Sequence, residues 1–256
     1  MPFSKENDGC HPQFKDAVCI DAGKVYDSCM ERDCLEDLRV FFGECDQEAI
    51  GNAVGCRVKS ANILDVLIDV EPVNFNRGFF SCDLTFFFKI KAEAVMPRQK
   101  NPRDITGICA FEKKVILCGS EGNVKIFSSR TKIGGEDEQN EMGTNLPECK
   151  VQCVEPVLLD SKICEMCSCC EPLIPFPGNV LRVIDGEAAN TGNRALFVSL
   201  GLFSIVQLVR DVQMLVPVFD FCIPEKECMK SAEEPCEMFS KLKFPTEEFF
   251  PEGCKK

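Results

Sequence analysis

Histidine, tyrosine and tryptophan are nearly absent from this sequence of 256 residues. It contains no tryptophan, one tyrosine (Tyr26) and one histidine (His11), against 21 phenylalanines. A serine–histidine or cysteine–histidine nucleophile pair would have to use His11, which lies in a polar stretch close to the start of the chain. A phosphate-binding loop and a GxGxxG motif between a strand and a helix are also missing. We therefore expect a protein that is not an enzyme.

Basic residues are scarce as well. The chain has 29 lysines and arginines against 41 acidic residues, which gives a formal net charge of −12. Nucleic acids and anionic membranes select proteins with clusters of lysine and arginine. We therefore expect neither of them as a partner.

Long apolar runs are missing too. The longest, Ala195–Val209, is interrupted by Ser199, Ser204 and Gln207 and falls short of the roughly 18 residues that indicate a membrane span. The first residues, MPFSKENDGCHPQ, are polar and lack the apolar segment of a secretory signal peptide. We expect synthesis in the cytoplasm without a signal peptide, and no membrane insertion.

Cysteine, by contrast, is abundant. The chain contains 19 cysteines, a number typical of disulfide-stabilised proteins from oxidising environments. A cytoplasm keeps thiols reduced, and an odd number of cysteines cannot pair completely within one chain. A protein made in a reducing cell and later exposed to oxidation would satisfy both observations.

Alternating apolar and polar residues predict a mainly β protein. In the stretch FFSCDLTFFFKIKAEA, which begins at Phe79, every second residue from Phe80 to Ala92 is apolar or cysteine. The stretch Ile63–Val73 shows the same period of two, and a turn is expected between them at Asn74–Gly78. Further strands are predicted at Ile108–Cys118, Asn123–Ser128, Lys150–Leu159, Val180–Ile184, Ala195–Leu208 and Val212–Cys222.

One short helix is predicted near the N-terminus. The stretch DCLEDLRVFF, Asp33–Phe42, begins with a helix-capping aspartate and spaces Leu35, Leu38 and Phe41 three residues apart. The expected fold class is mainly β, with one or two antiparallel sheet or sandwich units, this helix, and cysteine-rich irregular segments. The expected segments are a cysteine-rich N-terminal segment 1–56, a first β unit 57–130, a loop 131–148, a second β unit 149–224 with a cysteine cluster, and an irregular tail 225–256.

The stretch ICEMCSCCEP, Ile163–Pro172, holds four cysteines within seven positions. Three interpretations remain open: disulfides or intermolecular crosslinks, a metal site, or reduced thiols of a core. The metal hypothesis uses Cys149, Cys153, Cys164 and Cys167, whose spacing is near that of structural zinc sites. It leaves Cys169 and Cys170 without a role, and it places the first pair in a predicted strand. We favour crosslinking and expect no cofactor. The alternative is a zinc-binding or thiol-redox protein that uses the cluster Cys149–Cys170.

The other cysteines divide by their surroundings. Cys82, Cys109 and Cys118 lie in predicted strands, where a thiol packs as a small apolar group. Cysteines in polar segments and in the cluster have no such packing role, which makes them candidates for disulfides or crosslinks. They are Cys10, Cys19, Cys29, Cys34, Cys164, Cys167, Cys169, Cys170, Cys228, Cys236 and Cys254.

An enzymatic alternative would use three carboxylates. Asp65, Asp69 and Glu71 lie on the polar face of one predicted strand and could form a catalytic carboxylate set or bind a hard cation such as calcium. A solvated strand face explains the same pattern, and we favour that interpretation.

Two stretches resemble a known family. VYDSCMERDCLEDLRVFF (Val25–Phe42) and IDVEPVNFNRGFFSCDLTFFFKI (Ile68–Ile90) are similar to motifs of cysteine-rich, self-assembling spore-surface proteins of anaerobic spore-forming bacteria, found in the basal layer of the exosporium. The resemblance implies a structural subunit that is made in the mother cell without a signal peptide. It further implies a partner of its own kind in an ordered layer locked by cysteines, together with other spore-surface proteins, in the exosporium or coat. The family supplies no catalytic residues.

Overall fold

The computed structural model describes residues 16–97, 101–126, 143–165, 175–184, 186–189 and 192–218. They fall into two compact units. The larger is Gly23–Asp211, and the smaller includes residues 16–22 and 212–218. No helix among these residues is long and apolar enough to cross a membrane.

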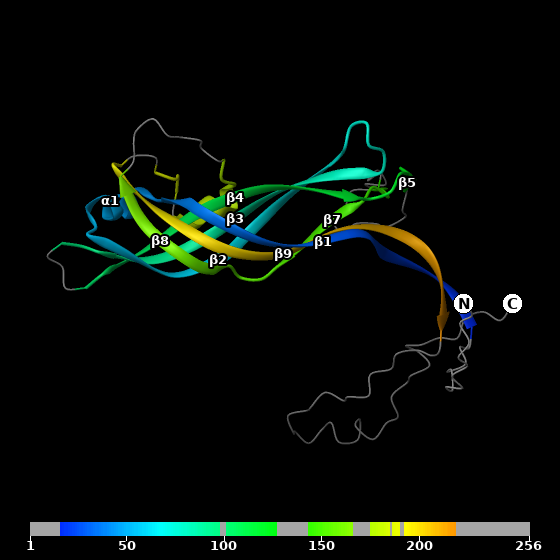
Figure 1. The fold of residues 1–256 in the computed structure, drawn as a ribbon, viewed down its shortest axis with the longest axis horizontal. Coiled ribbons are helices and arrows are strands. Elements are labelled where there is room, and N and C mark those ends of the chain that lie inside the picture. Colours follow the sequence, from blue (N-terminus) through cyan, green and yellow to red (C-terminus); the bar gives the residue numbers. More distant parts are fainter. Residues whose placement is uncertain are drawn as a thin grey trace, which may run out of the picture. The chain divides into compact units, whose positions relative to one another are not determined.

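Seven strands form one sheet in the order β2-β3-β4-β1-β9-β7, with β8 also paired to β9 (Figure 1). Their bounds are β1 Asp16–Phe42, β2 Gly55–Pro72, β3 Phe79–Val95, β4 Arg103–Cys118, β7 Glu148–Cys153, β8 Val157–Glu165 and β9 Arg194–Val218. Two short strands, β5 (Lys125–Ile126) and β6 (Gly143–Thr144), form a separate two-stranded sheet. The pairs β2–β3, β3–β4, β1–β4, β7–β9 and β8–β9 are antiparallel. The expected mainly β, antiparallel fold class is confirmed, and strands of both predicted β units share one sheet.

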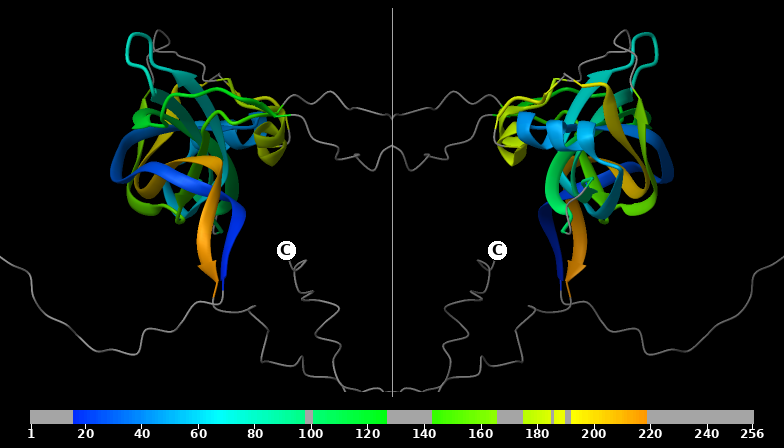
Figure 2. Two further views of the ribbon diagram at one scale, coloured as in Figure 1. Left: turned by 90° about the vertical axis from the view of Figure 1, so that its right-hand side faces the viewer. Right: turned by 90° about the vertical axis from the view of Figure 1, so that its left-hand side faces the viewer.

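Within the larger unit the sheet curls, as the views along the strands show (Figure 2). Its edge strand β2 thereby comes beside β7 and β8 near the opposite edge. The backbone amide of Ile63 in β2 donates a 2.9 Å hydrogen bond to the carboxylate of Glu155, between β7 and β8. The curled sheet encloses an interior filled by side chains from its concave face.

The alternation predicted for Phe79–Ala94 is the alternation of β3. Phe80, Cys82, Leu84, Phe86, Phe88, Ile90 and Ala92 are all buried in the main core. They meet inward residues of β9, among them Leu196, Leu200 and Leu208. Because both faces of an extended strand repeat every second residue, the sequence alone was sufficient for this prediction.

Three other strand predictions differ in detail. The predicted strand Lys150–Leu159 is split into β7 and β8 around Pro156, which has no amide hydrogen for a strand ladder. The stretches predicted at Ala195–Leu208 and Val212–Cys222 form one continuous strand, β9, as far as Val218. The strand predicted at Ile108–Cys118 begins five residues earlier, at Arg103.

The helix predicted at Asp33–Phe42 is wrong, because these residues belong to β1. Asp37 adopts a left-handed backbone conformation (φ 51°) in the middle of the stretch. This irregularity interrupts the period of two, so that Leu35 and Leu38 both contact the core although they are three residues apart. The short helix, α1, follows at Glu44–Asn52.

The strand predicted at Val180–Ile184 is also wrong. These residues form the helical turns α2 (Gly178–Leu181) and η1 (Arg182–Ile184). Val180 and Ile184 lie four residues apart, on one face of a helix. They cover a second core that includes Phe41, Phe87 and Ile108. A five-residue apolar stretch does not distinguish a strand from a helix.

Candidate functional site

The structure describes four of the candidate crosslinking cysteines. Cys19 in the smaller unit and Cys34 in the larger are exposed, whereas Cys29 and Cys164 are half-buried. Burial, and then the nearby carboxylate of Glu31, raise the pKa of the Cys29 thiol. The remaining candidates, Cys10, Cys167, Cys169, Cys170, Cys228, Cys236 and Cys254, lie outside the described residues.

The alternative zinc ligands do not form one tetrahedral set. Cys149 and Cys153 both belong to β7, where they pair with Leu208 and Ser204 of β9. Four residues of extended strand separate two side chains by about 13 Å, much more than the spacing of ligands on one zinc ion. Cys164 lies on β8 and Cys167 is outside the described residues. Within the described ranges no group of three or more histidine, cysteine or acidic side chains is arranged to hold a metal ion.

The cysteines assigned to packing lie in or beside the core. Cys82 and Cys109 are fully buried, and Cys118 is half-buried. Burial raises the pKa of Cys109 strongly and that of Cys56, on β2, to about 11. Because the thiolate is the reactive form of cysteine, Cys56 and Cys109 are poor nucleophiles at neutral pH.

The carboxylates of the enzymatic alternative do not converge on a site. Asp69 and Glu71 are exposed on β2. The carboxylate of Asp65 accepts a 2.7 Å hydrogen bond from the side chain of Asn179 in α2. The pocket described below includes none of these three carboxylates.

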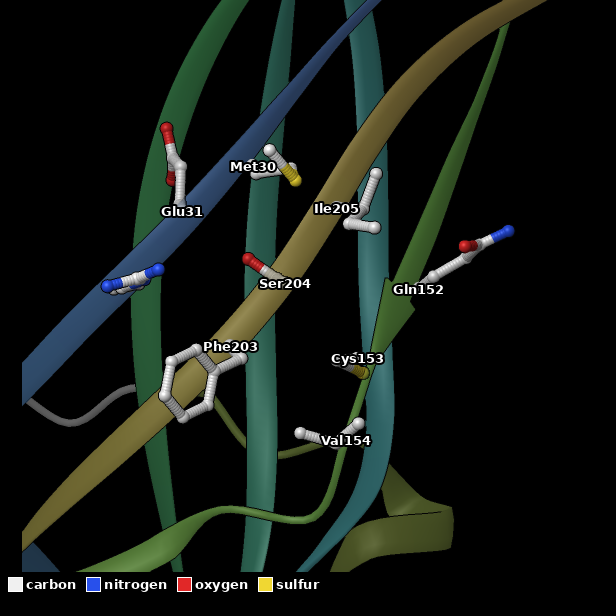
Figure 3. A pocket seen from close by; sticks show the side chains of 9 residues that line it. Met30, Glu31, Gln152, Cys153, Val154, Phe203, Ser204 and Ile205 are labelled. Atoms are coloured by element: carbon white, nitrogen blue, oxygen red, sulfur yellow. The ribbon is translucent and has the colours of Figure 1, made fainter.

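A pocket of about 600 Å³ lies across β1, β7 and β9 (Figure 3). The strands alternate here between buried and exposed residues: Leu202 and Ser204 are buried, whereas Phe203 is 49% exposed. The pocket is lined by Met30, Glu31, Arg32, Gln152, Cys153, Val154, Phe203, Ser204 and Ile205. We call this surface the outer groove.

The outer groove is apolar at its rim. Met30 is 84% exposed and Val154 is 59% exposed; in the close view Val154 lies on the side of Phe203 and Met30 on the side of Ile205 (Figure 3). The backbone amide of Val154 donates to the carbonyl oxygen of Phe203, which holds the β7 and β9 sides of the groove together. Clustered apolar side chains on a surface are typical of protein–protein contacts.

An exposed thiol lies next to the outer groove. Cys34 follows Arg32 by two residues on β1, and both side chains are exposed. Residues two apart on a strand share a face and lie about 7 Å apart. The groove and a free thiol therefore occupy the same outer face of the sheet.

Sequence reasoning missed two features of this surface. The outer groove combines residues from β1, β7 and β9, so no local pattern could reveal it. The exposed thiol of Cys45 lies in α1, a helix that was predicted in the wrong place. The signal for Cys34 was present, since it falls in a polar, cysteine-rich stretch.

The chain is similar to a protein named "Exosporium protein A" from Clostridium sporogenes (strain ATCC 15579). The two are 24% identical over an alignment of 261 residues, which covers 93% of this chain and 75% of that protein. No protein-family model matches the chain, and no solved structure matches it. The similarity supports the family resemblance seen in the sequence at the level of an exosporium-related protein.

Proposed function

We propose that this protein is a structural, non-enzymatic subunit of the bacterial spore surface. In this proposal it self-associates into an ordered layer that disulfides between subunits then stabilise. The observation that carries the proposal is the similarity to a protein named for the exosporium, which extends over 93% of the chain. In the proposal, the outer groove is the contact surface between subunits and the exposed thiols form the crosslinks.

The outer groove is the surface at which we place contact between subunits. Exposing Met30, Phe203 and Val154 to water is unfavourable, so covering them with a second copy stabilises the contact. Head-to-tail contacts between identical chains extend without limit when the rotation does not close, and rings of such contacts can tile a plane. A weak groove contact is sufficient if many copies repeat it.

Cys34 is the thiol that we assign to locking this contact. It is exposed beside the groove, so it is accessible to a surface cysteine of a chain seated there. A disulfide between chains requires Cα atoms about 4.4–6.8 Å apart, which only an ordered contact provides at high frequency. The locking is kinetic, because many bonds must be reduced before a subunit leaves the layer.

The proposal also includes the compartment where the protein is made and the place where it is located. Synthesis in the mother-cell cytoplasm keeps thiols reduced during folding, and oxidation follows at the spore surface, in the exosporium or coat. The partners are further copies of the chain and other spore-surface proteins. The net charge of −12 gives no support to a nucleic-acid partner.

Negative-stain electron microscopy of the purified full chain tests self-association. We expect ordered sheets or large closed assemblies in reductant, and assemblies that resist denaturant only after oxidation with a small disulfide. Phe203→Lys should raise the protein concentration needed for assembly by about tenfold, because it places a charge in an apolar contact. Ile116→Lys is the matched control, since Ile116 is similarly exposed but lies on β4, outside the groove.

Small monodisperse particles in both redox states would overturn the proposed function. Equal effects of the Phe203 and Ile116 substitutions would instead keep self-association but remove the outer groove as its site.

The assignment of Cys34 gives a separate prediction. Cys34→Ser should reduce the fraction of covalent oligomers on a non-reducing gel by at least about half after oxidation, while sheets still form in reductant. Cys45→Ser is the control, because Cys45 is also exposed but lies on α1. If the two serine variants lose crosslinks equally, Cys34 has no special role.

A further inference from the structure

Two buried cysteines meet inside the curled sheet although they lie far apart in the sequence. Cys82 is on β3, opposite Val70 of β2 and Val115 of β4. Cys149 is on β7, opposite Leu208 of β9. Three strands separate β3 from β7 in the sheet order, so the two thiols approach each other across the interior.

Their contact is direct. The side chains of Cys82 and Cys149 share a hydrogen bond and belong to the same core cluster, with exposed fractions of 0% and 8%. Cys82 and Cys149 are both free thiols in the structure.

The neighbouring residues show the same approach of the two strands independently. Gly119 lies between Phe80 and Pro147, each two residues before one of the cysteines. A Cβ atom at Gly119 would lie 2.8 Å from both rings. The beginning of β7 is therefore held close to the beginning of β3.

We propose that Cys82 and Cys149 form an intramolecular disulfide when the folded chain meets a small disulfide oxidant. The bond would fasten strand β7, at the end of the sheet order, to β3, across the interior from it. This inference is independent of self-association, because it concerns two thiols that no neighbouring chain can reach.

The two thiols are suited to different steps of the exchange. The hydrogen bond from the Cys82 thiol lowers the pKa of Cys149, against desolvation and the charges of Cys29 and Glu148, which raise it. The same bond and burial raise the pKa of Cys82. Cys149 is therefore the attacking thiolate and Cys82 the resolving thiol.

The reaction balances with one molecule of the oxidant, a small disulfide such as oxidised glutathione. The Cys149 thiolate attacks one sulfur, forming a mixed disulfide and releasing one glutathione thiolate. Cys82 then loses its proton and attacks the Cys149 sulfur, which releases the second glutathione. The protein loses two hydrogens, and one disulfide is reduced to two thiols. Access for the first step comes from opening of β7, which pairs with β9 on one side only in the sheet order.

The bond should stabilise the fold measurably. It would close a loop of about 70 residues, for which the loss of unfolded-state entropy predicts a rise in Tm of roughly 10 °C. Dithiothreitol should reverse the rise.

Peptide mapping of the full chain tests the proposal. Reduced protein at low concentration is oxidised with glutathione disulfide, alkylated, digested and analysed by mass spectrometry without reduction. We expect the peptides of Cys82 and Cys149 to be joined, with a mass two hydrogens below their sum. The oxidation is repeated in urea just below the unfolding transition, so that access to the interior is not limiting.

Two alanine variants separate this bond from other oxidation. Cys149→Ala should abolish the joined peptide and the rise in Tm. Cys109→Ala is the matched control, since Cys109 is another fully buried thiol and should leave both intact. Free Cys82 and Cys149 under both oxidation conditions, or Cys149 joined to Cys29 instead, would overturn the proposal.

Discussion

Replacing Lys113 with methionine is expected to lower the free energy of unfolding by about 3–5 kcal/mol, as measured by urea denaturation of the reduced protein. The Lys113 side chain is 9% exposed and points into the curled sheet from β4. Its ammonium lies 2.6 Å from Glu31 and 2.7 Å from Asp33, both on β1. It also donates a 2.9 Å hydrogen bond to Ser204 of β9. Methionine preserves much of the side-chain volume but leaves two carboxylates without their cation.

The next residue provides the control. Lys114 points outward, is 62% exposed, and pairs with Asp83 at 3.1 Å. Lys114→Met should change the free energy of unfolding by less than about 0.5 kcal/mol, because exposed ion pairs contribute little. Equal losses for the two lysines would mean that the cluster of Lys113, Glu31 and Asp33 is solvated.

The cluster should also respond to pH. Burial lowers the pKa of Lys113. The hydrogen bonds from its ammonium to Asp33 and Glu31 raise the pKa by more than burial lowers it, so the pKa lies above the ordinary value of 10.5. A cation with a raised pKa stabilises the folded state below its unfolded pKa, and this stabilisation is lost as pH rises through the folded pKa. The stability difference between wild type and Lys113→Met should therefore be constant near neutral pH and decrease above pH 10.5.

The inward orientation of the Lys113 side chain could have been predicted from the sequence. In the predicted strand Ile108–Cys118, Lys113 occurs at the same period as Val115 and Leu117, which are buried. A lysine on an apolar strand face needs acidic partners, but their identity depends on which strand comes next to β4. That strand is β1. Its residues from Asp33 were predicted to form a helix, and Glu31 was not placed in any strand, so neither acid could be connected to Lys113.

The other predictions were correct where they depended on local sequence and wrong where they depended on tertiary contacts. The alternation of β3 repeats over many residues and decides its own conformation. In β1, the positive φ of Asp37 interrupts the alternation, so the apolar residues on either side of it are spaced as they would be in a helix. Cys149 appeared as a ligand because of its distance along the chain from Cys153, whereas its actual neighbour, Cys82, is on a strand that the sequence leaves unconnected to it.

Cys109 is expected to react with iodoacetamide at least about 1000-fold more slowly than Cys34 in the reduced native protein. Cys109 is fully buried on β4, and burial raises its pKa, so both access and the thiolate form require opening of the structure. Cys34 is exposed on β1 and reacts without any opening. Isotope-coded alkylation, quenched at set times and followed by mass spectrometry, gives both rates in one sample.

The same measurement in concentrated guanidinium chloride is the control. There the two cysteines should react within a few-fold of each other, because unfolding removes both the burial and its effect on the pKa of Cys109. Similar rates in the native protein would mean that core thiols are available for crosslinking. The proposed locking of the layer requires different rates for the two thiols. Cys34 must be accessible to the oxidant at the spore surface, whereas burial must protect Cys109.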